Sequence, residues 1–171
     1  MVIDPSTLHF IFVLDRSGSM YGERIDNAKQ ALILFLRSLP FGCKFTVISY
    51  GSRQEFLSIR GVTGNIFEYT EENLTEAIRQ IETFDADMGG TNIASPMDMA
   101  INEVSDPALT KRVILLTDGQ ITEGEPAERV IELAAAENAI THTIGLSRGA
   151  DADLLERTAE AGRGSFSLID D

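Results

Sequence analysis

The sequence predicts an α/β fold: a doubly wound, mostly parallel six-stranded sheet with helices on both faces and one short antiparallel edge strand. The alternation of two kinds of segment leads to this prediction. Short runs of β-branched and aromatic residues alternate with longer segments in which apolar residues recur at helical spacing. Such alternation is typical of parallel strands joined by right-handed crossovers, which place helices on both faces of the sheet.

The first half of the chain contains clear strand and helix patterns. Leu8–Asp15 (LHFIFVLD) is a continuous apolar run that predicts a buried strand. Asp26–Leu39 has apolar residues at helical spacing and ends before Pro40. Lys44–Tyr50 (KFTVISY) predicts a second strand, and the more polar Arg53–Ile59 predicts the edge strand.

The second half continues the alternation. Thr70–Phe84 opens with Thr70-Glu-Glu-Asn73, a pattern that caps a helix, and Asp85–Thr91 (DADMGGT) is expected to be a loop. Further helices are expected over Ile93–Val104, Pro126–Asn138 and Asp151–Ala161, and further strands over Arg112–Thr117, Ile140–Leu146 and Gly164–Ile169.

Length, composition and charge limit the classes of function. The chain has 171 residues, of which 43% are hydrophobic and 24% charged, and we expect it to be one domain of a longer protein. A net charge of −13 disfavours nucleic acid and anionic membrane surfaces as partners and is compatible with cations. No apolar run reaches the roughly 18 residues of a membrane span, so we expect no membrane insertion.

The single cysteine, Cys43, excludes an internal disulfide and a cysteine-based zinc site. We expect Cys43 to be a small buried apolar residue and the protein to be cytoplasmic, with an extracellular location as the alternative. His9 and His142 fall within expected strands and are expected to be structural.

Polar clusters follow the strands at the points where a doubly wound sheet binds its ligands. Asp15, Ser17 and Ser19 follow the first strand, Asp118 follows the strand that ends at Thr117, and Thr91 lies in the loop that leads into a helix. We expect Gly18 to let the first loop turn sharply. We also expect Gly89 and Gly90 to let the second loop approach it closely. Two carboxylates and three hydroxyls are hard oxygen ligands, which suit Mg²⁺, Mn²⁺ or Ca²⁺ rather than zinc.

This set of residues, in this order and spacing, resembles the von Willebrand factor A (vWA) domain, a Rossmann-like fold. In that family the matching residues form the metal-ion-dependent adhesion site (MIDAS). The stretches FIFVLDRSGSM, SLPFGCKFTVISYGS and ADMGGTNI further resemble the A domains that follow a VIT domain. Those occur in inter-alpha-trypsin inhibitor heavy chains and in the vault-associated poly(ADP-ribose) polymerase.

The resemblance implies a Mg²⁺-dependent protein-binding module, not an enzyme, that captures an Asp or Glu carboxylate of a protein partner. It implies that Ser17, Ser19 and Thr91 contact the metal directly, and that Asp15 and Asp118 act mainly through water. It also implies a further helix after the last strand. Because the sequence ends at Asp171, we do not carry over a switch driven by that helix.

Residues beside the site have open roles. Arg16, Met20 and Asn92 flank it and are predicted to shape the choice of partner. Asp85 and Asp87 are expected to be loop or capping residues rather than metal ligands.

Two alternatives stay open at this point. One is a structural A domain whose metal site is unused. The other is a metal-dependent phosphatase-like enzyme on a similar sheet; a phosphatase of the haloacid dehalogenase type needs a second acid where this chain has Ser17. P-loop and GxSxG motifs are absent from the sequence.

Overall fold

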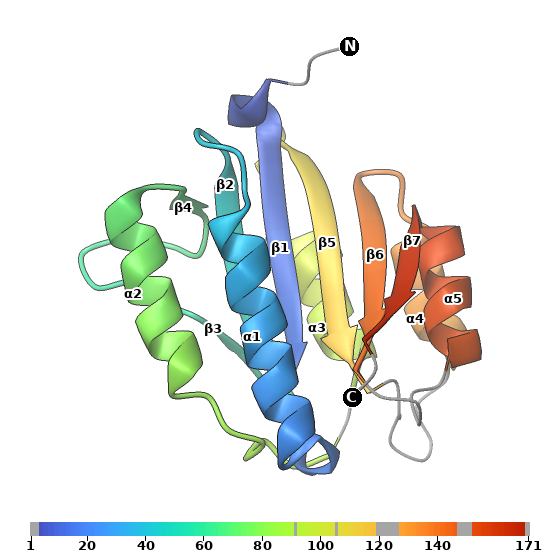
Figure 1. The fold of residues 1–171 in the computed structure, drawn as a ribbon. Helices are drawn as coiled ribbons and strands as arrows, with labels where there is room; N and C mark the ends of the chain where they lie inside the picture. Colours follow the sequence, from blue (N-terminus) through green and yellow to red (C-terminus); the bar gives the residue numbers. More distant parts are fainter. Residues whose placement is uncertain (1–3, 91, 105, 119–126, 147–151, 170–171) are drawn as a thin grey trace.

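The computed structural model describes residues 4–90, 92–104, 106–118, 127–146 and 152–169. Its centre is one sheet with strand order β3-β2-β1-β5-β6-β7, and β4 pairs with β2 beside β3 (Figure 1). The strands are β1 (Leu8–Asp15), β2 (Lys44–Tyr50), β3 (Gln54–Phe56), β4 (Phe67–Glu68), β5 (Thr110–Thr117), β6 (Ala139–Gly145) and β7 (Arg163–Leu168). β1, β2, β5, β6 and β7 run parallel, whereas β3 and β4 run antiparallel to β2.

Helices cover both faces of this sheet (Figure 1). They are α1 (Glu23–Arg37), α2 (Glu71–Glu82), α3 (Ala94–Asp98), α4 (Ala127–Ala134) and α5 (Ala152–Ala161). Alternate residues of β1 point to opposite faces. Phe12 therefore packs in the core under α1 and α2, while Ile11 packs in the core under α3, α4 and α5. The predicted doubly wound architecture is confirmed. None of the helices within the described ranges is long and apolar enough to cross a bilayer.

Several element boundaries differ from the prediction. The strand β4 was not predicted, because two residues are too short to show a period. The predicted edge strand shortens to three residues in β3. The helix α1 begins at Glu23, directly after Gly22 with its positive φ of 87°, and acidic residues in its first turn favour that start. The predicted cap of α2 is present, because the Thr70 hydroxyl accepts a hydrogen bond from the Asn73 backbone N–H at 3.1 Å.

The helix predicted over Ile93–Val104 is α-helical only in α3 and continues as a π-helix over Met99–Glu103. Side chains from outside the helix bind the carbonyl oxygens at this point. The buried Lys111 ammonium donates to the carbonyls of Ala100 and Ile101 at 3.1 and 2.7 Å. Since those carbonyls are satisfied by Lys111, the regular α-helical ladder is not needed to satisfy them.

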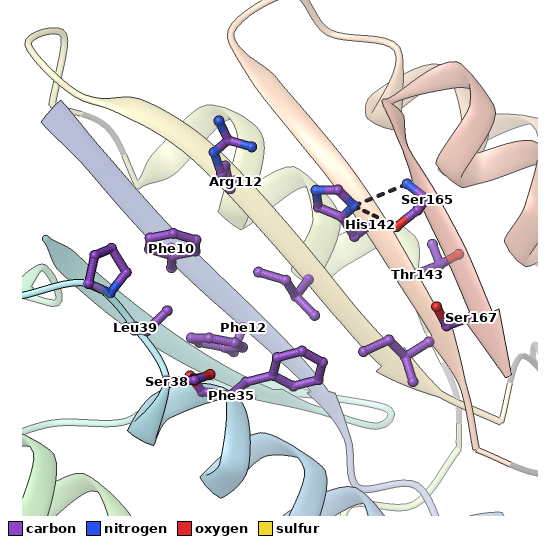
Figure 2. Close-up of a pocket in the computed structure, with 13 residues that line it drawn as sticks. Phe10, Phe12, Phe35, Ser38, Leu39, Arg112, His142, Thr143, Ser165 and Ser167 are labelled. Carbon is purple, nitrogen blue, oxygen red and sulfur yellow. Dashed lines mark hydrogen bonds between the residues drawn. The ribbon is translucent and has the colours of Figure 1, made fainter. Parts of the chain in front are cut away.

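A largely apolar hollow of about 390 Å³ lies between the end of α1 and the sheet (Figure 2). Phe12 and Phe35 line its apolar part, and Arg112 and His142 lie at its other end. The His142 Nδ1 atom accepts a hydrogen bond from the Ser165 backbone N–H at 3.0 Å. The hollow is on a sheet face, away from the strand ends where the polar clusters gather.

His9 is buried in β1 and its hydrogen bonds define its tautomer. The Thr46 hydroxyl gives its single proton to the Asn65 carbonyl at 2.7 Å, so it accepts from His9 Nε2 at 2.7 Å. Nδ1 is then unprotonated, with no hydrogen-bond partner among the described residues. Burial, and next the Lys111 charge, lower the pKa of His9 to about 4.

We expect this buried, neutral His9 to make the fold sensitive to acid. The pKa of His9 in the folded chain lies below its ordinary value, so protonation favours the unfolded chain. The free energy of unfolding is therefore unaffected by His9 above about pH 6.5 and falls as the pH falls towards 4, by about 3 kcal/mol in all. Urea unfolding at pH 7.5, 6 and 5 would measure the part of this loss that falls above pH 5, about 2 kcal/mol. The variant His9→Gln has no imidazole to titrate, so its loss over the same range should be smaller. Equal losses in both proteins would exclude His9 as the cause.

Candidate metal centre

β1 and β5 are neighbours at the centre of the sheet, and their carboxyl ends lie side by side (Figure 1). Here the strand order reverses: β2 and β3 lie on one side of β1, and β5, β6 and β7 lie on the other. β1 lies between β2 and β5, with Asp15 opposite Tyr50 on one side and Leu14 opposite Leu116 on the other. This register brings the residues that follow β1 next to Asp118, which follows β5. The sheet itself therefore assembles clusters that lie about a hundred residues apart in the sequence.

Asp15 is fully buried at the end of β1 and organises the first loop. Its Oδ1 accepts from the Ser17 backbone N–H at 2.8 Å, and its Oδ2 accepts from the Thr117 hydroxyl at 2.7 Å. Burial raises the pKa of Asp15 to about 6, and the neighbouring Asp118 charge adds to this rise. A positive ion nearby would stabilise the charged form of this carboxylate.

Three side-chain oxygens lie together above Asp15. The Ser17 and Ser19 hydroxyl oxygens are 3.0 Å apart, and the Ser19 hydroxyl donates to Asp118 Oδ2 at 2.6 Å. In an octahedron with metal–oxygen distances near 2.1 Å, adjacent ligand oxygens are about 3 Å apart. The spacing of the two serine hydroxyls therefore fits neighbouring ligands of one Mg²⁺ or Mn²⁺ ion.

Any metal held here depends on hydroxyls, because no three His, Cys, Asp or Glu side chains in the described ranges gather as a metal site. A hydroxyl-rich site with two carboxylates suits hard divalent ions. The oxygen ligands of Ser17, Ser19 and Asp118 thus fit the divalent ion, Mg²⁺, Mn²⁺ or Ca²⁺, that the sequence predicts.

The loop that carries Thr91 packs against the first loop through backbone hydrogen bonds. The Gly18 N–H donates to the Gly89 carbonyl at 2.7 Å, and the Met88 N–H donates to the Arg16 carbonyl at 3.0 Å. Thr91 itself lies outside the described residues, so its predicted role as a ligand stays a prediction.

The glycines of the two loops differ in what they do. Gly89 accepts a hydrogen bond from the Gly18 N–H at 2.7 Å through its carbonyl, so the close approach to the first loop that is expected of it is present. It has a φ of +79°, and a Cβ there would lie 2.5 Å from Ser52 Oγ. The expectation that Gly18 is needed for a sharp turn is wrong. Gly18 is not among the residues with positive φ, and a Cβ there would meet the Gly89 carbonyl at an ordinary 3.7 Å.

The three predicted partner contacts lie in different environments. The Met20 side chain is fully buried in the core, so it presents no surface to a partner. Its neighbour Tyr21 is the exposed residue of the pair, at 83%. The sequence analysis does not name Tyr21, because the sequence pattern does not show which of the two side chains faces inwards. Asn92 is partly buried, and its side-chain oxygen accepts from the Ser95 N–H at 3.2 Å at the start of α3.

The Arg16 side chain is 11% exposed and is used within the chain. Its guanidinium pairs with Asp87 at 2.8 Å, donates to the Asp85 carbonyl at 3.0 Å and lies 4.2 Å from the centre of the Phe84 ring. Asp87 is thus paired through its carboxylate and Asp85 is contacted through its backbone carbonyl in this loop; that neither is a metal ligand stays a prediction.

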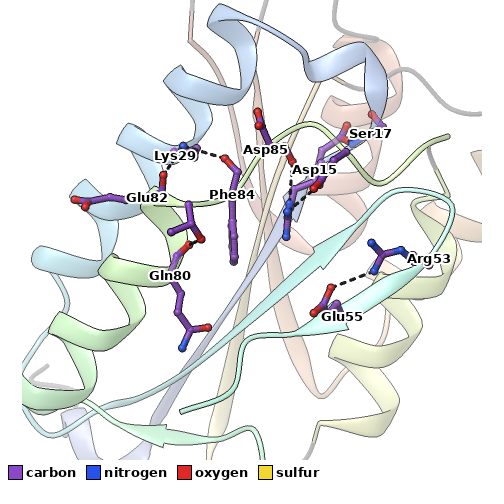
Figure 3. Close-up of polar contacts among 12 residues, drawn as sticks. Asp15, Ser17, Lys29, Arg53, Glu55, Gln80, Glu82, Phe84 and Asp85 are labelled. Atoms are coloured by element: carbon purple, nitrogen blue, oxygen red, sulfur yellow. Dashed lines mark hydrogen bonds and ion pairs between the residues drawn. The ribbon is translucent and has the colours of Figure 1, made fainter. Parts of the chain in front are cut away.

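Lys29 of α1 fixes the other end of this loop by donating to the carbonyls of Glu82 and Phe84, each at 2.9 Å. Figure 3 shows Phe84 and Asp85 between Lys29 and the segment of Asp15 and Ser17. Lys29 of α1 and Arg16, which follows β1, therefore both help to hold the loop in place.

Two contributors to the site were not predicted. The Thr117 hydroxyl donates a hydrogen bond to Asp15, although the sequence analysis treats Thr117 only as the last residue of a strand. Arg24 lies in the first turn of α1, with its Nη1 atom 3.6 Å from Asp118 Oδ2 and donating to the Ser19 carbonyl at 3.2 Å. Arg24 belongs to no local motif. Thr117 belongs to the Thr-Asp-Gly run at the end of β5, but only the packing of distant segments shows that it holds Asp15.

A family model described as the von Willebrand factor type A domain matches residues 8–168. The chain belongs to the von Willebrand factor A domain family. Von Willebrand factor A domain-containing protein 5A of Rattus norvegicus is 31% identical over 169 residues, which cover 94% of this A domain and 20% of that protein. A von Willebrand factor A domain-containing protein of Dictyostelium discoideum is 34% identical over 164 residues, covering 95% and 17%. The A domain spans about a fifth of the length of these relatives.

Solved structures share the fold of this A domain at low identity. A von Willebrand factor type A protein from Catenulispora acidiphila gives a TM-score of 0.81 at 23% identity, covering 96% of this chain and 39% of that one. The manganese-loaded TRAP protein of Plasmodium vivax gives 0.76 at 20% identity, covering 98% and 70%. Proximal thread matrix protein 1 from the mussel byssus, with a zinc-occupied MIDAS motif, gives 0.70 at 19% identity, covering 96% and 43%.

Proposed function

We propose that this A domain is a binding module, not an enzyme, that captures an Asp or Glu carboxylate of a protein partner through a divalent ion. Ser17, Ser19 and Thr91 would hold the ion, with Asp15 and Asp118 acting mainly through water. Mg²⁺ is the proposed ion, with Mn²⁺ or Ca²⁺ as alternatives. The observation that carries the proposal is the cluster of Ser17, Ser19 and Asp118 oxygens, joined by contacts of 3.0 and 2.6 Å.

The ligand types determine what the site does. A divalent ion bound there supplies a positive charge that an incoming carboxylate can bind. Ser17 and Ser19 are neutral ligands, so they leave much of that charge uncompensated. Asp15 holds the Ser17 backbone in place and is itself held by Thr117, which keeps the hydroxyls oriented before a partner arrives. The zinc-occupied MIDAS motif named for the mussel protein and the manganese-loaded state named for the Plasmodium protein support a divalent ion as a ligand of this fold.

The phosphatase-like alternative is disfavoured by the state of Asp15. A carboxylate that attacks a phosphate must be accessible, but Asp15 has no exposed surface, and both its oxygens accept hydrogen bonds. A purely structural A domain with an unused site is the remaining alternative. Nothing in the packing of the sheet requires Ser19, which is exposed, to face Asp118.

The proposal also covers the location of the protein in the cell and the domain next to this one. We propose a cytoplasmic location and a place beside a VIT domain in a longer protein. The likeness to von Willebrand factor A domain-containing protein 5A over only a fifth of its length is compatible with a multidomain parent.

The experiment that tests the function compares wild type with Ser19→Ala. Ser19 is exposed, so removing its hydroxyl should cost little stability but should weaken Mg²⁺ binding about 10-fold or more, as measured by calorimetry. Ser38→Ala removes a hydroxyl at the opposite end of α1, where Ser38 donates to the Phe35 carbonyl, and should bind like wild type.

Acetate then serves as a probe for the partner carboxylate. Added to the Mg²⁺-loaded chain, it should shift the amide NMR signals around Ser17 and Ser19, and the shifts should disappear with excess EDTA. Equal Mg²⁺ affinity in wild type and Ser19→Ala, or acetate shifts that persist in EDTA, would contradict the proposed mechanism.

A further inference from the structure

The guanidinium of Arg24 lies at the oxygen cluster described above. Its Nη1 atom is 3.6 Å from Asp118 Oδ2, the same oxygen to which the Ser19 hydroxyl donates at 2.6 Å. It also donates to the Ser19 carbonyl at 3.2 Å. Arg24 therefore contacts two of the residues at which the divalent ion is proposed to bind.

The position of Arg24 is not explained by the stability of its helix. It lies in the first turn of α1, where the helix dipole disfavours a cation, and Glu23 and Asp26 are the residues that suit this end. Its contact with the fully buried Asp118 compensates for that position, because a buried carboxylate requires a nearby positive charge. Asp15 adds a second buried negative charge beside Asp118.

A guanidinium and a divalent ion cannot both lie close to Asp118 without repelling each other. At separations of a few ångströms, repulsion between charges of +1 and +2 is large even with strong screening. The Arg24 side chain is 32% exposed, so it can turn towards solvent without opening the core. Tyr21, 83% exposed, lies on the same stretch of chain between the two serines and α1.

We propose that Arg24 is a resident counter-charge of Asp118 that competes with the divalent ion and is displaced when the ion binds. This inference rests on the proposed function of the site. Arg24 therefore sets the metal affinity of the site below what its oxygens alone would give.

The test measures Mn²⁺ affinity from the paramagnetic resonance signal of the free ion, in the 171-residue chain. Arg24→Gln is expected to bind Mn²⁺ about three- to tenfold more tightly than wild type, because repulsion is removed and Asp118 is no longer neutralised. Arg24→Lys keeps the positive charge and should therefore stay closer to the affinity of wild type than Arg24→Gln does. Arg37→Gln removes the same charge from the exposed far end of α1, about 20 Å away, and serves as the matched control.

A second readout follows the side chain itself. The Nε–Hε NMR signal of Arg24 should shift when Mg²⁺ is added to wild type, and that shift should be absent when Asp118 is replaced by asparagine. A signal unaffected by Mg²⁺ at saturation would overturn the displacement.

The outcomes separate this inference from the proposed function. If wild type and Arg24→Gln both fail to bind Mn²⁺, the metal site and the role of Arg24 are both rejected. If wild type binds and Arg24→Gln binds no more tightly than Arg37→Gln, the metal site stands and the role of Arg24 is rejected. Binding by Arg24→Gln alone would be the strongest form of the expected result.

Discussion

Replacement of Asp118 by asparagine is expected to lower the affinity of the chain for Mg²⁺ by about 10- to 100-fold while leaving the metal-free fold intact. The asparagine oxygen can still accept the Ser19 hydroxyl bond that now measures 2.6 Å, so the shape of the site is kept. The negative charge is lost, and with it most of the attraction for a divalent ion. Calorimetric titration of wild type and Asp118→Asn would measure the difference.

Thermal unfolding in EDTA provides the control for this variant. Asp118 raises the pKa of the neighbouring Asp15, which shows that the two buried carboxylates repel each other. Removal of one charge relieves that repulsion, so the melting temperature of the metal-free variant should be equal to or above that of wild type. A variant that binds Mg²⁺ as wild type does would remove Asp118 from the site.

A methyl group at Gly51 is expected to destabilise the fold by roughly 2–3 kcal/mol and to weaken metal binding at the same time. Gly51 follows β2, and a Cβ there would lie 2.2 Å from the Met88 carbonyl oxygen, which cannot move without its loop. That loop is held by the bonds from Met88 N–H to the Arg16 carbonyl and from Gly18 N–H to the Gly89 carbonyl. Displacing it would separate the two loops of the metal site.

Thermal unfolding and Mn²⁺ titration of Gly51→Ala would measure both effects. For a chain of this length, the expected loss corresponds to a melting temperature about 5–10 °C lower. Gly18→Ala is the matched control at the same edge of the sheet, since its Cβ would meet its nearest neighbour at 3.7 Å, and it should melt within about 2 °C of wild type. Similar melting temperatures for both variants would show that the loop yields to the new methyl group.

The sequence by itself determined the sheet and the covering helices of this protein. Continuous apolar runs such as the one in β1 can only be buried on both faces, and the helical spacing in α1 and α2 specifies the face that each helix buries. The residues at the strand ends were also predictable, because parallel strands end at one edge. Short or context-dependent elements were not predictable from the sequence. β4 has only two residues. The change from α3 to a π-helix depends on Lys111, which lies beyond that helix in the chain.

The tertiary structure decided how the residues of the site contact one another. It turned Met20 inwards and Tyr21 outwards, assigned Arg16 to the loop of Asp85 and Asp87, and brought Arg24 to Asp118 across 94 positions of sequence. It also placed Gly51 against Met88, where space rather than backbone conformation requires a glycine. A sequence pattern records the local periodicity and the type of each residue. Contacts between distant loops depend on the register of the strands, because the register decides which side chains can contact the same oxygen. Those contacts are therefore fixed only when the sheet has formed.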